Sequence, residues 1–143
     1  MSTKLEHYFW DSCVFTAYLK NEQQAYDVDS IASFLDDVKR GKAKIYTSSI
    51  VLAEVLPSQL TNGSFDDFLE EFQSMIVMVD ASTNILKRAS SLRDIKYSKS
   101  NSNKRSLGVA DAIMLSTCIE LKQSYGIELI KGVYILDIPK YKM

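Results

Sequence analysis

Three carboxylates lie in apolar stretches of this sequence, and carboxylates are the side chains that bind hard cations and move protons. Asp11 lies in YFWDSCVF, Glu54 in SIVLAEVL and Asp111 in LGVADAIML. An ionised carboxylate in an apolar interior is costly unless it is paired, protonated or bound to a cation. These three acids are therefore the candidate catalytic and metal-binding residues.

Each acid also has a purely structural explanation. Asp11 could cap a helix that starts at Ser12, Glu54 could pair with a lysine, and Asp111 could complement the positive end of a helix. These explanations must hold independently, whereas convergence in one pocket explains all three acids at once. Converged carboxylates repel one another, so the cluster needs a cation. With no His or Cys close by in the motifs, an all-oxygen set favours Mg²⁺ or Mn²⁺.

The elements that would position these acids are short apolar strands alternating with helices. Strands are expected at 8–10, 44–47, 76–79 and 133–136, helices over 28–38, 50–56, 65–75, 83–92 and 107–123, and a serine-rich loop over 97–106. Ser48 and Ser49 could cap the second of these helices, and residues 80–83 supply a cap for the fourth. The pattern predicts a single α/β domain over 1–143, a three-layer α/β/α sandwich with a central, mainly parallel sheet.

In open α/β sheets, ligands bind beyond the carboxyl ends of the strands. Asp11 directly follows the first expected strand. Glu54 and Asp111 lie in early turns of helices, and helices that begin at strand ends point their first turns at the same crevice. Three elements far apart in sequence could therefore bring three carboxylates into one pocket.

Composition and charge narrow the class of protein. The chain has 143 residues, of which 46% are hydrophobic and 24% charged, with a net charge of −1. No apolar run reaches the roughly 20 residues of a membrane span, and no secretion signal is evident, so a cytoplasmic protein without a membrane partner is expected. Cys13 and Cys118 are too few for a disulfide framework and are expected to pack in the core.

Positive charge is concentrated in one part of the chain. Residues 87–105 contain seven basic side chains against a single acid, Asp94. The basic residues are Lys87, Arg88, Arg93, Lys96, Lys99, Lys104 and Arg105. Such a strip could attract a polyanion, or it could be a solvated helix face that runs into a polar loop.

The motifs match a known family in order and type. WDSCVF near the start, LAEVL on a mid-chain helix and then VADAIMLSTCIEL resemble the PIN domain, and more narrowly the VapC-type ribonuclease toxins of toxin–antitoxin modules. The resemblance covers nearly the whole chain, and VADAIMLSTCIEL is its most specific part. It implies a Rossmann-like sandwich and a Mg²⁺- or Mn²⁺-dependent endoribonuclease acting on RNA. Asp11, Glu54 and Asp111 match three acidic metal ligands of the family, which also implies a homodimer and a small antitoxin protein as partner.

The sequence departs from the family at one point. Most members carry a fourth acid on a strand after the long helix, whereas here residues 119–126 run almost directly into IELIKGVYILDIP, and Asp137 comes late. Two interpretations therefore stay open. The protein is an active ribonuclease holding one or two metal ions, or it is a catalytically lapsed PIN domain that acts as an RNA- or protein-binding regulatory module.

Overall fold

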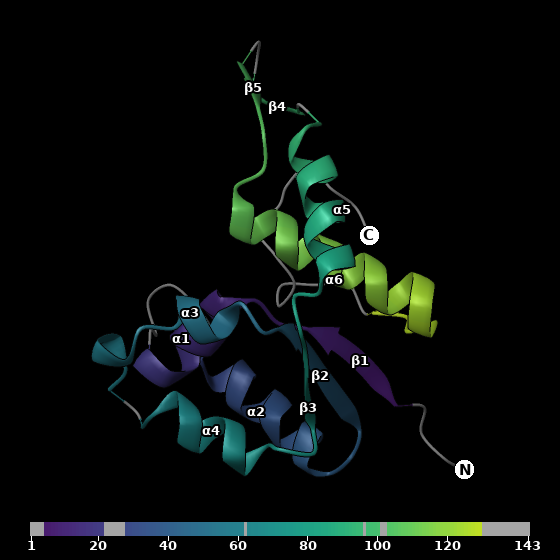
Figure 1. Ribbon diagram of the computed structural model, residues 1–143. Coiled ribbons are helices and arrows are strands. Elements are labelled where there is room, and N and C mark those ends of the chain that lie inside the picture. The colour runs from purple at the N-terminus through teal and green to yellow at the C-terminus, as the bar shows by residue number, and fades with distance from the viewer. Residues whose placement is uncertain (1–4, 22–27, 62, 96, 101–102, 130–143) are drawn as a thin grey trace.

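A three-stranded parallel sheet forms the centre of the protein. The computed structural model describes residues 5–21, 28–61, 63–95, 97–100 and 103–129. The strands, in spatial order, are β1 (Glu6–Phe9), β2 (Ala43–Ser48) and β3 (Ile76–Val79) (Figure 1). Phe9 pairs with Tyr46 and Ser48 with Val79, so the carboxyl ends of the strands meet at one edge of the sheet. The predicted α/β class with parallel strands is confirmed for the described residues.

Helices lie on both sides of this sheet. They are α1 (Ser12–Lys20), α2 (Val28–Lys39), α3 (Val51–Glu54), α4 (Phe65–Glu71), α5 (Thr83–Arg93) and α6 (Val109–Tyr125), with a 3₁₀ turn at η1 (Pro57–Gln59). In Figure 1, α1, α2 and α4 lie on one side of the sheet and α5 and α6 on the other. Phe15 of α1, Ile45 of β2 and Met114 of α6 share one hydrophobic core, so helices from both sides bury the strands between them.

Several helix ends follow the sequence signals. The strand over 76–79 is found as expected, and the following helix, α5, starts at its N-cap Ser82, whose Oγ accepts a hydrogen bond from the Ile85 N–H at 3.3 Å. After α2, Gly41 adopts a φ of 77°, and Gly126 ends α6 with a φ of 66°. Both glycines take up left-handed backbone that other residues avoid.

The helix after β2 is shorter than predicted. It ends at Glu54, and the expectation that it continues to Leu56 is wrong. Proline disfavours helical backbone in the residue before it, and Leu56 is extended, with φ −89° and ψ 119°, directly before Pro57. Nor does Ser49 cap this helix, since its Oγ instead accepts a hydrogen bond from the backbone beyond β3.

The segment expected to be a loop over 97–106 contains a β-hairpin instead. Strands β4 (Tyr97–Ser100) and β5 (Asn103–Arg105) pair antiparallel, with Tyr97 opposite Arg105 and an irregularity between Ser98 and Ser100. The loop prediction is wrong because this segment is polar apart from Tyr97, so the alternation of apolar residues that reveals a strand is missing. The hairpin projects from the end of α5, away from the sheet (Figure 1).

Three further outcomes concern the ends of the chain. The first strand starts and ends earlier than the expected 8–10, and Trp10 is buried just beyond it. The only sequence signal for helix α1 is Asp11 as a candidate cap before Ser12. The strand expected at 133–136 lies outside the described residues. Among the helices that are described, none has the length and apolar character needed to cross a membrane.

Candidate functional site

Asp11 is held at the carboxyl end of the sheet by its neighbour in the chain. The Trp10 N–H donates to the carbonyl of Tyr46 at 2.9 Å. In return, the buried hydroxyl of Thr47 donates to the carbonyl of Trp10 at 2.7 Å. Trp10 is thus bonded to β2 through both of its backbone polar groups, and this fixes where the next residue, Asp11, leaves the sheet.

The Asp11 side chain makes no capping hydrogen bond at the start of α1. Its backbone is extended at the position before α1, yet its carboxylate makes no capping hydrogen bond. Instead, the Cys13 thiol donates to Oδ1 at 2.7 Å. Burial is the largest influence on this half-buried carboxyl and raises its pKa. The Cys13 thiol and the N–H groups of Cys13 and Val14 lower the pKa, whereas the negative charge of Glu54 adds to the rise. A capping hydrogen bond from Asp11 to α1 is therefore not formed, although these two N–H groups of its first turn still favour the charged carboxylate.

Glu54 is the second acid at this end of the sheet. It is the last residue of α3 and half-buried. Its Oε1 atom is buried and accepts no hydrogen bond within the described structure. No lysine among the described residues pairs with it, so the ion-pair explanation is not realised either. A buried carboxylate oxygen without a partner costs free energy, and this one lies near a second carboxylate.

Serines at the end of β2 fix the turn that leads to α3. The N–H of Ser49 donates to the Val79 carbonyl at 2.9 Å, and its Oγ accepts from the Ala81 N–H at 3.1 Å. Ser48 Oγ accepts from the N–H of Ile50 at 3.3 Å. These bonds join the ends of β2 and β3 and fix where α3 begins.

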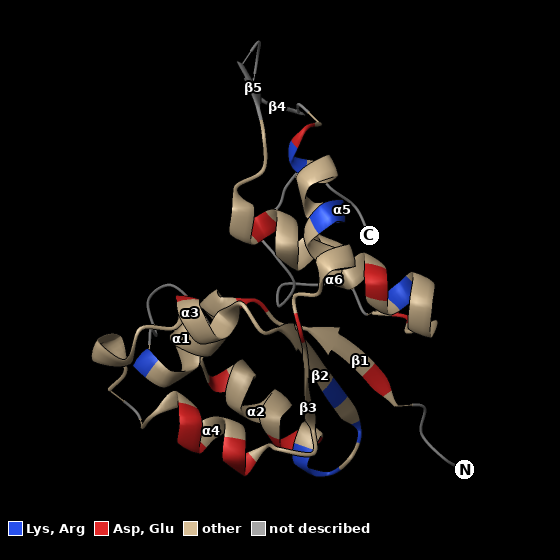
Figure 2. Cartoon of the chain, viewed as in Figure 1, with Lys and Arg blue, Asp and Glu red and all other residues tan. Residues whose placement is uncertain are grey.

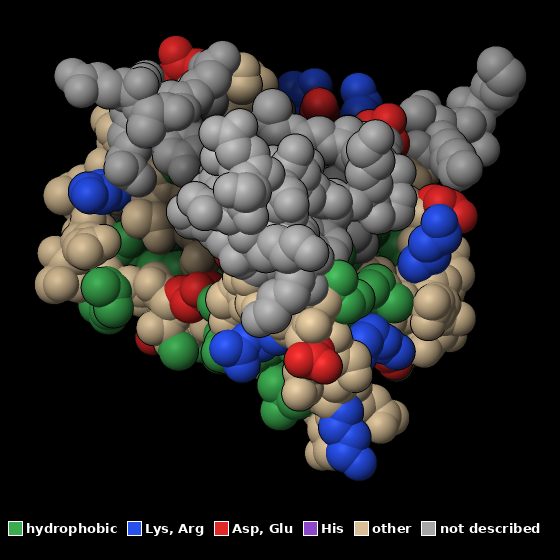
Figure 3. Space-filling view, turned by 90° about the horizontal axis from the view of Figure 1, so that it is seen from above, with side chains coloured by type: hydrophobic (Ala, Val, Ile, Leu, Met, Phe, Trp, Pro, Cys, Tyr) green, Lys and Arg blue, Asp and Glu red, His purple; other side chains and the backbone are tan. Residues whose placement is uncertain are grey.

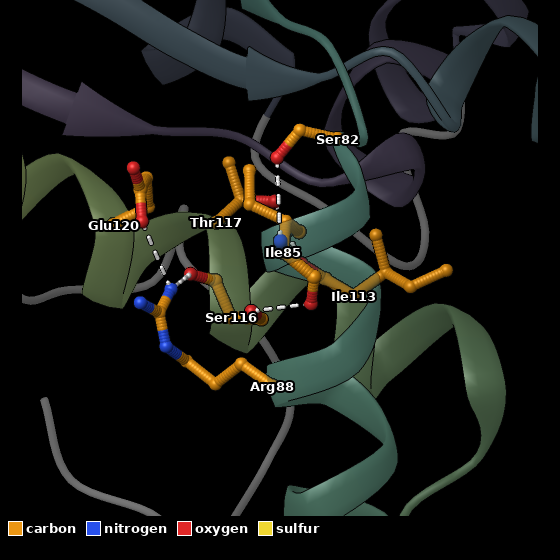
Figure 4. A network of polar contacts seen from close by, with 7 residues as sticks. All are labelled: Ser82, Ile85, Arg88, Ile113, Ser116, Thr117 and Glu120. Atoms are coloured by element: carbon orange, nitrogen blue, oxygen red, sulfur yellow. Dashed lines mark hydrogen bonds and ion pairs between the residues drawn. The ribbon is translucent and has the colours of Figure 1, made fainter.

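Asp111 is exposed in the first turn of α6. This helix is held against α5 by the polar network of Figure 4. Buried Ser116 donates through Oγ to the Ile85 carbonyl at 2.8 Å, and Arg88 donates at 3.2 Å both to the Ser116 carbonyl and to Glu120 Oε1. The network sets the position of α6, and with it the position of Asp111, relative to the sheet.

Two of the three predicted acids lie at the same end of the sheet. Burial is the main cause of the raised pKa of Asp11, and the negative charge of Glu54 adds to the rise, so the two carboxylates are within electrostatic reach of one another. Within the described part of the chain, however, no group of three or more His, Cys, Asp or Glu side chains is arranged to hold a metal ion, so Asp111 is not assembled with this pair. Two carboxylates with a buried, unpartnered oxygen fit a hard cation that completes its shell with water and phosphate. The three-acid site stays a prediction.

Both cysteines lie near Asp11, Cys13 through the chain and Cys118 through the packing of α6. Both pack in or against the hydrophobic core, as expected. Cys118 is fully buried, and burial together with the nearby charge of Asp11 raises the pKa of its thiol. Its approach to Asp11 depends on how α6 crosses the sheet, which no local pattern shows.

A hollow of about 490 Å³ lies elsewhere, between β3 and the end of α6. Apolar side chains such as Val79, Leu121 and Ile127 form much of its wall. Neither Asp11 nor Glu54 lines it. A small apolar molecule bound in this hollow would therefore not meet the two acids.

Comparison with family models and with curated proteins identifies no relative of this chain. No protein-family model matches the chain, and no curated protein matches it significantly. An assignment of function therefore depends on the motifs in the sequence and on the geometry of the acids.

Proposed function

We propose that the protein is a Mg²⁺- or Mn²⁺-dependent endoribonuclease of the PIN type, which hydrolyses RNA phosphodiester bonds. The observation that carries this proposal is the buried, unpartnered Oε1 of Glu54 beside the half-buried Asp11, whose pKa is raised. Such a pair is unfavourable for the fold by itself, because Asp11 is desolvated and Glu54 keeps a buried oxygen without a hydrogen-bond partner. A divalent cation would remove both costs, and it is the usual partner of paired carboxylates.

The proposed roles follow from the places of the residues. Asp11 and Glu54 hold the cation, and the thiol of Cys13 keeps Asp11 Oδ1 in place. Asp111, in the first turn of α6, is the proposed third ligand or the group that orients the attacking water. When bound, the cation would lower the pKa of water and neutralise charge on the phosphate.

The partners implied by the family are part of the same proposal. We place the protein in the cytoplasm as a homodimer and as the toxin of a toxin–antitoxin pair. Apolar surface next to the acids supports a protein partner: Leu52 and Leu56, within and just after α3, are 54% and 47% exposed. A hollow of about 440 Å³ that includes Leu52, Val55 and Leu60 borders the same helix. A short apolar segment of an antitoxin could dock here.

Cleavage of RNA tests the activity directly. Labelled single-stranded RNA is incubated with Mn²⁺ and wild type, Asp11→Asn or the surface control Asp66→Asn, which lies on α4. We expect Asp11→Asn to abolish cleavage while its circular dichroism stays that of the wild type, and Asp66→Asn to cut normally. An unchanged cleavage rate in Asp11→Asn would contradict the proposal.

A catalytically lapsed PIN domain is the second candidate, and the lack of an assembled group of three acids in the described chain favours it. Thermal unfolding with and without Mn²⁺ separates the two. Binding to the folded state alone stabilises it by about 1.4 kcal/mol when the cation is at tenfold its Kd. If the protein is a nuclease, Mn²⁺ should raise the unfolding midpoint of the wild type and leave that of Asp11→Asn unchanged. A lapsed domain predicts no response in either protein.

A further inference from the structure

Strand β3 forms an open edge of the sheet, because it is the last strand in the described order β1-β2-β3. The Met75 carbonyl accepts the Ile45 N–H at 3.1 Å. The Val79 carbonyl likewise accepts the Ser49 N–H at 2.9 Å, so the odd-numbered residues here bond to β2. Successive residues of a strand direct their backbone polar groups to opposite sides. The N–H and C=O of Met78 therefore point away from β2, and no described group bonds to them.

This edge lacks the features that normally protect an edge strand. Charged side chains, proline and bulges keep such strands from pairing with other chains. Residues 76–79 read IVMV, without a charge or a proline, and their pairing with β2 has no irregularity. The side chains of 77–79 are only half-buried. An apolar strand with unbonded groups on its outer side is a template for a further strand.

The hollow of about 490 Å³ between β3 and the end of α6 lies along the same edge. Val77 and Val79 line it from the face of the sheet that they share with Tyr46. Met78, which belongs to the opposite face of the strand, lines it as well, so the hollow reaches around the outer edge of β3. A strand added beside β3 would place an aliphatic side chain in this hollow, since alternate side chains of an added strand enter pockets on one face.

The charge around the hollow is negative. The charged residues among its described lining are Asp80 and Glu120. Glu120 is paired with Arg88, whereas no described cation pairs with the exposed carboxylate of Asp80. Asp80 directly follows β3, at the end of the open edge. A basic side chain on an added strand would meet this carboxylate there.

Helix α4, which leads into β3, extends the negative charge and appears red in Figure 2. Its acids are Asp66, Asp67, Glu70 and Glu71, of which only Glu71 is paired with a described cation, Lys39. On the face seen from above, by contrast, the Lys and Arg side chains that are drawn lie among Asp and Glu (Figure 3). A basic partner would therefore be attracted to the β3 side of the protein.

A second copy of this chain fits the edge poorly. Two β3 strands paired with each other would bring Asp80 of each copy to one interface, together with two acidic α4 helices. Residues 72–82 contain no Lys or Arg to offset these charges. Like charges brought together in an interface disfavour binding, so the edge favours a partner of opposite charge.

We propose that the open edge of β3, with the hollow beside it, binds an extended basic segment of a protein partner by strand addition. Backbone hydrogen bonds to Met78 set the register of the segment, an aliphatic side chain fills the hollow, and a Lys or Arg next to it pairs with Asp80. The surface is separate from the carboxylate pair, since neither Asp11 nor Glu54 lines the hollow. The inference goes beyond the proposed ribonuclease activity and does not depend on it.

Peptide selection tests this edge. Random twelve-residue peptides displayed on phage are selected on wild-type protein, after removal of those that bind Met78→Pro protein. Proline here deletes an N–H that faces away from β2, as edge strands tolerate, whereas the control Met78→Ala keeps that N–H. We expect enrichment of peptides in which alternating aliphatic residues adjoin a Lys or Arg. Their Kd by fluorescence anisotropy should rise about tenfold for Met78→Pro and far less for Met78→Ala.

Charge and hydrogen bonding are measured on the same selected peptide. Asp80→Lys should raise its Kd by about threefold or more at 0.1 M salt, and the matched control Asp94→Lys, an exposed acid at the end of α5, should leave it unchanged. Hydrogen exchange followed by NMR reports the strand directly. The Met78 amide should exchange rapidly in the unbound protein and slowly in the complex, while the amides of Val77 and Val79 exchange slowly in both.

The proposal fails if no peptide prefers wild type to Met78→Pro, or if the Met78 amide stays unprotected in the complex. It also fails if the selected peptides are acidic or bind Asp80→Lys as tightly as wild type. A wild-type dimer that Met78→Pro converts to a monomer would show that the edge pairs two copies instead. Should Met78→Pro fail to fold, peptides selected on wild type alone are N-methylated at single amides. Loss of binding at alternate amides supports strand addition, and equal binding throughout refutes it.

Discussion

Replacing Glu54 by glutamine should stabilise the protein when no metal is present. The substitution keeps the shape of the side chain and removes the charge from a buried oxygen that has no hydrogen-bond partner in the described structure. It also removes a negative charge that adds to the rise in the pKa of Asp11, of which burial is the main cause. The new amide group could in addition donate to the Asp11 carboxylate, which the glutamate cannot do.

The size of the effect follows from the burial of that oxygen. Leaving a buried polar group without a partner costs about 1–3 kcal/mol, and the amide must satisfy its own polar atoms, so we expect a gain of about 1 kcal/mol. For a chain of this size, that corresponds to a rise in Tm of roughly 2–4 °C. The control Glu70→Gln changes an exposed acid on α4 and should stay within about 0.5 kcal/mol of wild type.

The assay is thermal unfolding of the three proteins at pH 7, first in EDTA and then in Mn²⁺. In EDTA, Glu54→Gln should unfold at the highest temperature. In Mn²⁺ at tenfold its Kd, the wild type gains about 1.4 kcal/mol, while the variant has lost a ligand and gains little, so the order of wild type and variant should reverse.

Two results would refute this reasoning. If Glu54→Gln is less stable than wild type in EDTA, the Glu54 carboxylate makes a favourable interaction and its charge does not destabilise the metal-free fold. If Mn²⁺ raises the Tm of both proteins equally, the cation binds elsewhere.

Two further predictions use the same measurements. Because the pKa of Asp11 is raised in the folded state, ionised Asp11 lowers stability at pH values above that pKa, and the effect is absent below its ordinary pKa of 3.8. Asp11→Asn should therefore stabilise the metal-free protein at pH 7, and urea titrations should show this gain vanishing as the pH falls to 3. A gain that does not depend on pH would contradict the prediction. Ser116→Ala removes a buried hydrogen bond of 2.8 Å between α6 and the Ile85 carbonyl on α5 and should cost about 1–2 kcal/mol. Thr117→Val removes only a hydrogen bond within α6 and should cost less stability. Equal losses in the two variants would show that the hydrogen bond between the helices stabilises the fold no more than one within a helix.

Regular amphipathic elements could be predicted from the sequence. The apolar run at 76–79 and the serine cap at Ser82 are local signals, and both elements are found where expected. The hairpin at 97–105 was missed because it is held by backbone pairing in a polar segment. The end of α3 at Glu54 differs from the expected end because both Val55 and Leu56 are extended; Pro57 explains the backbone of Leu56, and no sequence signal indicates that of Val55.

The candidate site, too, could be predicted only in part from the sequence. The approach of Asp11 and Glu54 follows from a parallel sheet, since residues after adjacent strands must meet at one edge. The place of Asp111 depends on how far α6 is shifted and rotated along α5, which is decided by contacts such as Ser116 with Ile85. Those contacts are distant in sequence and have no periodic signature.

The pairing of β1 has a consequence for synthesis on the ribosome. One side of β1 pairs with β2, and the other forms a parallel bridge from His7 to Leu129, just beyond α6. Strand β1 is synthesised early, but the bridge at its outer edge forms only after Leu129 has been made. About 80 residues separate the end of β2 from Leu129, so at ~5–20 residues per second that edge stays open for roughly 4–16 s. During that interval the nascent chain presents an unpaired strand edge on which other chains could pair, and chaperone binding would be most valuable then.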